Sequence, residues 1–310
     1  MPESKSTRHV FGPVPSRRLG RSLGVDLVPL KTCSFDCIYC QLGRTTCKTI
    51  EIREYVPLDE VIQNVREKLS TSPDYITLSG SGEPMLYSRL GEIIEAIKNM
   101  TSIPVAILTN GSLLWMPQMR RAIMGADLVV PSLDAGNEKQ FQYINRPHEN
   151  ISFDRFVEGL ISFRNEYSGS YWLEVFFLEG LNSTEFEAND IMEITKRIEP
   201  DLIQLNTVAR PPTEDYAKGV SREDMLRLAA LFGDKAEVIA DFSHVHDQPL
   251  FKAASRDVAE MIARRPCSIN DIAEGLGIHV NEAIKHVEEL IRRGEISAVN
   301  TEKGIYYRTV

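Results

Sequence analysis

The sequence predicts an α/β fold, in which a partial, TIM-like (β/α) barrel precedes a small C-terminal winged helix-turn-helix domain. Short apolar segments alternate with amphipathic segments of helical period up to about residue 245, as in a parallel sheet covered by helices. About six or seven such units in ~220 residues favour a barrel-like sheet, with an open doubly wound sheet as the alternative. We therefore expect one domain over residues 1–245 and a second over residues 246–310.

The strands of the larger domain are expected in apolar segments flanked by turn-forming residues. They lie at Leu23–Pro29, Tyr75–Ser79, Val105–Thr109, Leu128–Leu133, Tyr171–Leu178, Leu202–Val208 and Val238–Phe242. The helices lie at Leu58–Leu69, Leu90–Met100, Met116–Met124, Phe153–Asn165, Glu185–Ile198 and Arg222–Phe232. Ser221, followed by Asp224, is a suitable N-cap for the last helix. The segment 11–20, rich in turn formers, is predicted to be irregular.

The smaller domain follows a change in composition at residues 243–249, which we interpret as a linker. The expected elements are helices at Ala253–Arg265, residues 268–275 and Val280–Arg293, and a hairpin within Glu295–Arg308. Ser268 is expected to cap the second of these helices. Three helices followed by a hairpin are typical of a winged helix-turn-helix.

Composition places the chain among globular proteins, with 43% hydrophobic and 25% charged residues. No apolar run approaches the ~18 residues of a membrane helix, and the polar N-terminus does not resemble a signal peptide. We therefore expect a cytoplasmic protein without a membrane partner. The net charge of −9 argues against a general nucleic-acid coat. However, residues 1–56 hold nine Lys/Arg against five Asp/Glu, so a basic surface is expected there.

Three of the five cysteines form a C-x3-C-x2-C motif, Cys33, Cys37 and Cys40, after the first expected strand. This crowding is poorly suited to disulfides and well suited to a metal or cluster. Three thiolates can each bind one iron of a [4Fe–4S] cluster and leave the fourth iron without a protein ligand. S-adenosylmethionine (SAM) could chelate that iron, and a reducing cluster could then release a 5′-deoxyadenosyl radical. Such chemistry requires an electron donor such as ferredoxin or flavodoxin.

The alternative for this motif is a structural zinc site with Cys47 as the fourth ligand. Zinc ligands are usually spaced in pairs within small, loop-rich folds, whereas this loop opens an α/β domain. We therefore favour the cluster and expect Cys47 to be a spare thiol. Cys267 is expected in the core of the smaller domain.

The cysteine loop, with Tyr39 directly before Cys40, resembles the radical SAM superfamily, and the resemblance extends over residues 11–245. It implies a radical SAM barrel with a [4Fe–4S] cluster and SAM as cofactors. The segment 12–26 is similar to the branch that contains archaeal wyosine-base synthases, which rebuild a guanine in tRNA. Those synthases carry further N-terminal cysteines for a second cluster, whereas no cysteine precedes Cys33 here.

The same resemblance implies a set of cofactor-binding residues. Residues 79–83 match the Gly–Glu turn whose backbone and carboxylate bind the SAM amino group, and glycines permit this close approach. Polar residues at later strand ends are expected to reach the SAM ribose, the substrate or an interior cavity. The alternatives are turns, caps and buried hydrogen-bonded pairs. The expected residues are Tyr39, Ser79, Gly80, Ser81, Gly82, Glu83, Asn110, Ser132, Asp134, Gln204 and Asn206.

Other polar residues lie outside this set. Glu174 interrupts an apolar strand and is expected in the same cavity. Arg17, Arg18 and Arg21 form the densest basic cluster, which could hold RNA phosphates or the SAM carboxylate, or be solvated surface. The linker histidines, His244 and His246, are expected to be exposed.

Three functions follow from these observations. The first is radical modification of a tRNA base or other RNA, which the branch resemblance and the basic N-terminal segment favour. The second is modification of a protein, peptide or small metabolite, with the winged helix as a docking module. It is supported by the mixed charge of Val280–Arg293, because DNA-binding recognition helices are normally basic. The third is a redox-sensing DNA-binding regulator, which gives the turn at residues 79–84 no role.

Overall fold

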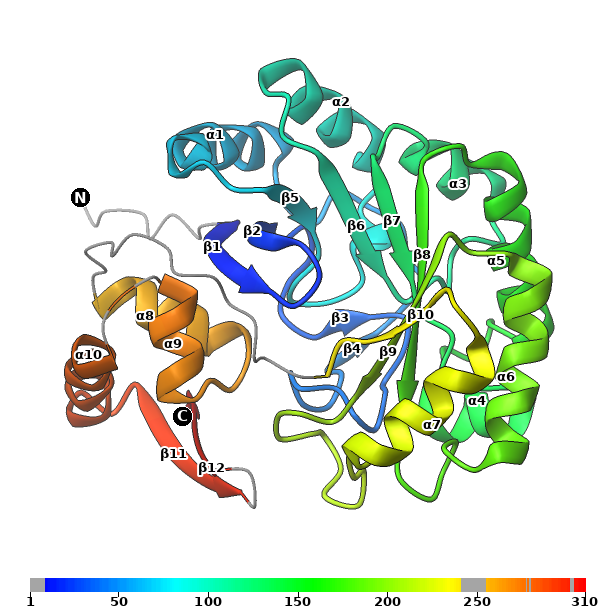
Figure 1. Cartoon of the computed structure of the whole chain (residues 1–310). Coiled ribbons are helices and arrows are strands. Elements are labelled where there is room, and N and C mark those ends of the chain that lie inside the picture. Colours follow the sequence, from blue (N-terminus) through cyan, green and yellow to red (C-terminus); the bar gives the residue numbers. More distant parts are fainter. Residues whose placement is uncertain (1–8, 241–254, 277, 279, 302–303) are drawn as a thin grey trace.

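One sheet of eight strands organises the residues described by the computed structural model, which are 9–240, 255–276, 278, 280–301 and 304–310 (Figure 1). In spatial order the strands are β1 (Val10–Ser16), β2 (Gly20–Val25), β5 (Tyr75–Leu78), β6 (Val105–Thr109), β7 (Leu128–Pro131), β8 (Ser170–Phe177), β9 (Leu202–Thr207) and β10 (Ala236–Val238). Neighbours from β2 to β10 are parallel, whereas β1 is antiparallel to β2. A doubly wound sheet has a point at which the strand order reverses, whereas the order from β5 to β10 follows the sequence without a reversal. This favours the partial barrel over the open sheet.

The helices between these strands form an arc outside the sheet (Figure 1). They are α1 (Leu58–Lys68), α2 (Leu90–Met100), α3 (Pro117–Ile123), α4 (Glu138–Ile144), α5 (Phe153–Glu166), α6 (Glu185–Ile198) and α7 (Arg222–Phe232), with short 3-10 turns at Leu69–Thr71 and Pro84–Leu86. Right-handed crossovers between successive parallel strands place helices on one side of a sheet. In α2, for example, Leu90, Ile93 and Ile97 are buried on one face. No helix in the described part of the chain is long and apolar enough to span a membrane.

The expected elements of the barrel agree closely with the structure. The bounds of β6, α2, α6 and α7 are the predicted ones, and the other predicted elements between residues 58 and 208 differ by a few residues at their ends. Ser221 caps α7 as expected, because its side chain accepts a hydrogen bond from the backbone N–H of Asp224. The sequence analysis missed α4.

The prediction of an irregular segment at residues 11–20 is wrong. Most of this segment belongs to β1, which pairs with β2 with a bulge between Phe11 and Val14. Proline removes a backbone donor from a ladder, so two prolines argued against a strand. β1 is an edge strand, however, and has one neighbouring strand in the sheet. The backbone N–H that proline lacks is therefore not required by a second neighbour.

The C-terminal region contains α8 (Ser255–Arg264), α9 (Ile269–Leu276), α10 (Val280–Arg292), β11 (Ile296–Thr301) and β12 (Gly304–Thr309). They follow in the predicted order, and β11 pairs antiparallel with β12. Their buried apolar side chains form a separate core that includes Cys267, as expected. The side chain of Ser268 accepts from Asp271 N at 3.1 Å, as an N-cap does. The expected linker, with His244 and His246, lies outside the described residues.

Two short strands complete the region of the cysteines. β3 (Thr32–Cys33) and β4 (Cys47–Lys48) pair in parallel, so the cysteine loop leaves and returns to one place. The loop lies at the edge of the sheet where the parallel strands have their carboxyl ends. In α/β sheets this is the edge at which ligands bind.

Candidate active site

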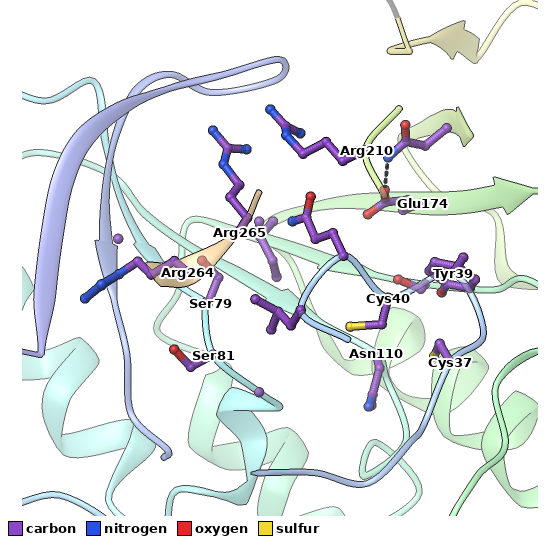
Figure 2. Close-up of a pocket in the computed structure, with 18 of the residues that line it drawn as sticks. Cys37, Tyr39, Cys40, Ser79, Ser81, Asn110, Glu174, Arg210, Arg264 and Arg265 are labelled. Carbon is purple, nitrogen blue, oxygen red and sulfur yellow. Dashed lines mark hydrogen bonds between the residues drawn. The ribbon is translucent and has the colours of Figure 1, made fainter. Parts of the chain in front are cut away.

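A pocket of about 440 Å³ lies at the carboxyl ends of the parallel strands, and we call it the central pocket (Figure 2). Its volume is in the range of roughly 300–1,000 Å³ that is usual for ligand sites. All three motif cysteines line it. The other expected residues that line it are Tyr39, Ser79, Gly80, Ser81, Gly82, Asn110, Ser132 and Asn206. The fold thus brings together residues that are up to about 170 positions apart in the sequence.

The cysteine loop is held by backbone hydrogen bonds to the end of α4. Asp36 N donates to Asn145 O at 3.0 Å, and Ile38 N donates to Ile144 O at 2.9 Å. Within the loop, Cys40 N donates to Cys37 O at 3.1 Å. The loop conformation therefore does not depend on a bond between the sulfur atoms.

Two amide side chains donate to the cysteine sulfur atoms. Asn110 Nδ2 lies 3.5 Å from Cys33 Sγ, and Asn145 Nδ2 lies 3.6 Å from Cys37 Sγ. Hydrogen bonds of this kind tune the potential of iron–sulfur clusters. Asn145 has no place in the cysteine motif, and sequence reasoning missed it.

The three thiols fit a group that supplies positive charge. Burial raises the pKa of Cys33 to about 12, and it raises the pKa values of Cys37 and Cys40 as well. A coordinated metal would offset this cost because it deprotonates the thiols that bind it. The donor set of three partly buried cysteines and two N–H···S contacts therefore fits a [4Fe–4S] cluster.

Cys47 lies apart from this donor set. It is exposed on β4 and is not among the residues that line the central pocket. Within the described residues, no three His, Cys, Asp or Glu side chains are grouped around a position for one metal ion. Cluster thiolates each bind a different iron and need no such convergence, whereas a structural zinc ion takes four ligands at one point.

The glycine turn at residues 79–83 lies against the start of the cysteine loop. Gly80 has a φ of +122°, and a Cβ there would lie 1.9 Å from Asp26 Oδ1. A Cβ on Gly82 would lie 1.9 Å from the carbonyl oxygen of Thr32. Only glycine permits this approach. The turn is bonded in place because Asp26 Oδ1 accepts from Ser81 N at 2.7 Å and Glu83 N donates to Thr32 O at 3.1 Å.

The Glu83 carboxylate lies behind the pocket wall, contrary to the expected contact with SAM. Its side chain is buried and does not line the pocket. Oε1 accepts from Met85 N and from Thr109 Oγ1, and Oε2 accepts from Asn110 N at 2.8 Å. Burial raises the pKa of Glu83 to about 7, although these bonds oppose the shift. Because three donors already occupy it, the carboxylate braces the turn against Asn110.

Asp134 is also one layer behind the pocket. It accepts from Tyr39 Oη, from Asn145 Nδ2 at 2.8 Å and from Phe176 N at 3.0 Å. Burial raises its pKa to about 6. The ring of Tyr39 stacks on Phe176 with centroids 4.0 Å apart. Asp134 thus positions the Tyr39 ring, and Tyr39 is the residue that lines the pocket.

Gln204 does not reach the pocket, although Asn206 does. Gln204 is buried, and its Nε2 donates to Glu237 Oε1 on β10 at 2.7 Å. The two residues share one face of β9, but side chains two positions apart are separated by roughly 6.6 Å along a strand. The pocket lies at the carboxyl end, so it includes only the later residue.

The side of the pocket away from the three motif cysteines is basic, and we call it the arginine end. Its residues are Arg17, Arg18, Arg210, Arg264 and Arg265. In Figure 2, Arg210 and Arg265 lie away from Cys37 and Asn110. Lys31 lines the pocket near the cysteines, and Glu174 is the single carboxylate among the described lining residues. Arg21 instead donates to the carbonyl oxygen of Thr71, outside the pocket.

Glu174 links the arginine end to the sheet. Its carboxylate accepts two hydrogen bonds from Arg18, both of 3.0 Å, and one from Asn206 Nδ2 at 2.8 Å. Burial alone would raise the pKa of Glu174, but the charge and hydrogen bonds of Arg18 leave it below its ordinary value. Asn206 Oδ1 in turn accepts from Arg17 Nη1 at 2.9 Å. Glu174 is therefore ionised and fixes the N-terminal arginines above β8 and β9.

The C-terminal region supplies part of this wall. Arg264 Nη2 lies 3.1 Å from Asp26 Oδ2, and its guanidinium lies 3.8 Å above the centre of the Phe11 ring. Arg210 Nη2 lies 2.9 Å from Asp271 Oδ1 at the start of α9. Figure 1 shows α8 and α9 beside the β1–β2 hairpin. Sequence reasoning missed Arg210, Arg264 and Arg265 because no motif surrounds them.

The fold and site together define an α/β enzyme with a three-thiol cluster loop at the carboxyl ends of its strands. The chain belongs to the radical SAM superfamily, whose family model matches residues 27–189. Its cofactors are accordingly a [4Fe–4S] cluster and SAM, as expected. The three cysteines of this site are the residues that would hold the cluster.

Two known proteins are similar to most of this chain. The chain is 40% identical over 228 residues to a UPF0026 protein of Methanocaldococcus jannaschii, which covers 72% of this chain and 71% of that protein. It is 42% identical over 292 residues to a protein of Brachyspira hyodysenteriae named GTPase Obg, covering 93% of this chain but only 42% of that protein. The chain therefore spans less than half the length of that relative.

A solved structure shares the fold. A radical SAM methyltransferase from Sphaerobacter thermophilus superimposes with a TM-score of 0.53 and 16% sequence identity, over 70% of this chain and 66% of the other. At this level of identity the likeness concerns the fold.

Proposed function

We propose that the protein modifies a base of RNA, with tRNA as the first candidate, by radical chemistry in the central pocket. The charge of the pocket carries this proposal. Six cationic side chains and one carboxylate line its described part, although the whole chain has a net charge of −9. A phosphate-bearing substrate is the natural partner of such a pocket. The resemblance of residues 12–26 to the wyosine-base branch supports the same class of substrate.

The part of the pocket formed by the three motif cysteines, Tyr39, residues 79–82, Asn110 and Ser132, which we call the cysteine end, would hold the cofactors. When bound, a [4Fe–4S] cluster supplies the electron that splits SAM into methionine and a 5′-deoxyadenosyl radical. The backbone of Ser79–Gly82 would bind the SAM amino group, while Tyr39, Asn110 and Ser132 would border its nucleoside. Asn206 would lie between SAM and substrate.

We further propose that the barrel covers residues 1–245 and that residues 246–310 form a winged helix. α10 and the residue that follows it carry Glu282, Glu288 and Glu289 beside Lys285, Arg292 and Arg293. This balance argues against duplex DNA as its partner, because DNA-binding helices are normally basic. It favours a second candidate function, modification of a protein or peptide that docks on α10. A cytoplasmic location and a ferredoxin- or flavodoxin-like electron donor remain predictions.

Mass spectrometry of nucleosides tests the proposal. Total tRNA and other RNA from cells with and without the gene would be digested and compared. We expect a modified nucleoside that disappears when the gene is absent and returns with the wild-type gene but not with a Cys37→Ala copy. Identical nucleosides in both cells, together with a changed peptide mass in the proteome, would replace RNA by the second candidate.

A further inference from the structure

Three arginines of the arginine end come from three separate parts of the chain. Arg17 follows β1, Arg210 follows β9 and Arg265 follows α8. All three line the central pocket. The pKa of Arg17 is lowered to about 10, first by burial and then by the charges of Arg210 and Arg265. The positive charges of Arg210 and Arg265 thus act on Arg17, which still remains protonated at neutral pH.

The carboxylate of Asp271, which pairs with Arg210, has further hydrogen-bond partners. Asp271 pairs with Arg210 and also accepts from the backbone and hydroxyl of Ser268 at 2.8 Å. Among the described residues, no carboxylate lies within ion-pair distance of the Arg265 guanidinium. Burial lowers the pKa of Arg265, and Arg210 lowers it further. The described part of the fold thus brings several positive charges together at one end of the pocket.

We propose that Arg17, Arg210 and Arg265 form a phosphate subsite that holds the backbone phosphate of the substrate nucleotide. This inference rests on the proposed function. A guanidinium presents a planar fork of donors that matches two phosphate oxygens, and an anion between three such groups relieves their repulsion. Binding at this end fixes the nucleotide while its base extends toward Asn206 and the cysteine end. Positioning of this kind lowers the barrier of a radical reaction because the reacting atom is already oriented.

The SAM carboxylate is a poorer occupant of this subsite. SAM must chelate a cluster at Cys33, Cys37 and Cys40, and Figure 2 shows Arg210 and Arg265 at the other end of the pocket. The subsite is therefore assigned to the substrate.

The same assignment makes the C-terminal region part of the active site. Arg265 lies beyond the last turn of α8, which the Arg264–Asp26 ion pair holds against β2. The hydroxyl of Tyr306 on β12 donates to Ala209 O, next to Arg210, at 2.9 Å. The C-terminal region thus completes the subsite, which differs from the separate docking module expected from the sequence.

Calorimetric titration of the full-length, cluster-reconstituted protein tests the subsite. The probes are inorganic phosphate, pyrophosphate, adenosine 5′-monophosphate and a single-stranded octaribonucleotide, all at one ionic strength set with chloride. The variants are Arg265→Gln, Arg265→Lys and Arg17→Gln. The control is Arg256→Gln, which removes the same charge from the exposed side of α8, where Arg256 pairs with Glu260.

We expect at least a tenfold weaker affinity for pyrophosphate and for the octaribonucleotide in Arg265→Gln and Arg17→Gln. A lost charge-assisted hydrogen bond contributes on the order of 1.5–3 kcal/mol, which corresponds to this factor. Arg265→Lys should recover part of the affinity because it keeps the charge without the fork. Arg256→Gln should bind as the wild type does. Tighter binding of the octaribonucleotide than of the mononucleotide would assign the subsite to RNA, and the reverse order would assign it to a free nucleotide.

Equal affinities in the wild type, Arg265→Gln and Arg17→Gln would overturn the subsite. A merely structural role for Arg265 would lower the melting temperature but leave the gain in melting temperature on adding pyrophosphate unchanged, and this too would overturn it. Weakened phosphate binding in these variants, with no change in cellular RNA when the gene is absent, would keep the subsite and remove RNA as the substrate.

Discussion

The two ends of the central pocket are built in different ways. The cysteine end consists mainly of uncharged groups from adjacent loops, with Lys31 close to the cysteines, and backbone hydrogen bonds join its glycine turn to the start of the cysteine loop. The arginine end consists of charged groups from the N-terminal hairpin, the end of β9 and α8, and ion pairs join them. The first end is therefore a local structure of the barrel. The second depends on how the C-terminal region packs on the barrel, so substitutions should separate the two.

The largest expected effect is at the cysteine end. Ala at Cys33, Cys37 or Cys40 should abolish the cluster and the release of 5′-deoxyadenosine from SAM, because each thiolate binds one iron. Iron content and visible absorbance after anaerobic reconstitution measure the first, and chromatography measures the second. Cys47→Ala is the matched control and should retain both. Loss of the cluster in the Cys47 variant would show that the ligand set is wrong.

The next largest effect is expected at the arginine end, where Glu174→Gln should lower the stability of the folded protein. It leaves Arg18 without its buried partner, which costs on the order of 3 kcal/mol of unfolding free energy. Urea denaturation at several pH values would measure this.

The pH dependence gives this prediction a second test. The pKa of Glu174 is depressed in the folded protein, so its stabilising contribution is present above its ordinary pKa of 4.5 and is lost as the pH falls through the lower, folded value. The difference between wild type and variant should therefore be constant from pH 7 down to about 4.5 and shrink in stronger acid. A difference that shrinks already near pH 7 would contradict the ionised pair.

Glu83→Gln should have a smaller effect. The amide presents N–H groups to a carboxylate position that now accepts three hydrogen bonds, so one donor loses its partner at a cost of about 1–3 kcal/mol. Thermal unfolding would measure the loss, with Glu92→Gln on the exposed face of α2 as the control. If stability were unchanged while SAM affinity fell tenfold, the carboxylate would face SAM as the sequence suggested.

The smallest effect is expected for Gln204→Ala. Loss of its bond to Glu237 should cost about 1 kcal/mol of stability and leave SAM affinity as in the wild type. Asn206→Ala, two residues later on the same face, should weaken pyrophosphate binding because Asn206 holds Arg17. Equilibrium binding of SAM and pyrophosphate to both variants would separate the roles. Similar losses of SAM affinity in both would place Gln204 in the pocket after all.

These contrasts follow what sequence can and cannot reveal. The cysteine end is predictable because Cys33–Cys40 and Ser79–Glu83 are contiguous motifs, and strand ends place Asn110 and Ser132 beside them. Periodicity also assigned Gln204 to the right face of β9. Periodicity could not show which residues on that face reach the pocket, because this depends on how close each residue lies to the carboxyl end of the strand.

The arginine end was predictable only in Arg17 and Arg18, which lie in one short segment of the sequence. Arg210, Arg264 and Arg265 are single charged residues in unremarkable segments, and only the packing of α8 and α9 on the N-terminal hairpin brings them together. Tertiary packing also decides the roles of Glu83 and Asp134. Their positions at strand ends correctly predicted that they lie near the pocket. Whether their carboxylates face the cavity or the wall depends on tertiary donors such as Asn145.

Deuterium transfer tests most directly whether both ends serve one reaction. RNA would be purified from cells that lack the gene and were grown in deuterated medium, then incubated with reconstituted protein, dithionite and SAM of natural isotopic composition. If the arginine end holds RNA with its base beside the radical, mass spectrometry will find deuterium in the 5′-deoxyadenosine. Unlabelled 5′-deoxyadenosine with this RNA, and labelled product with the deuterated protein fraction of the same cells, would contradict the account.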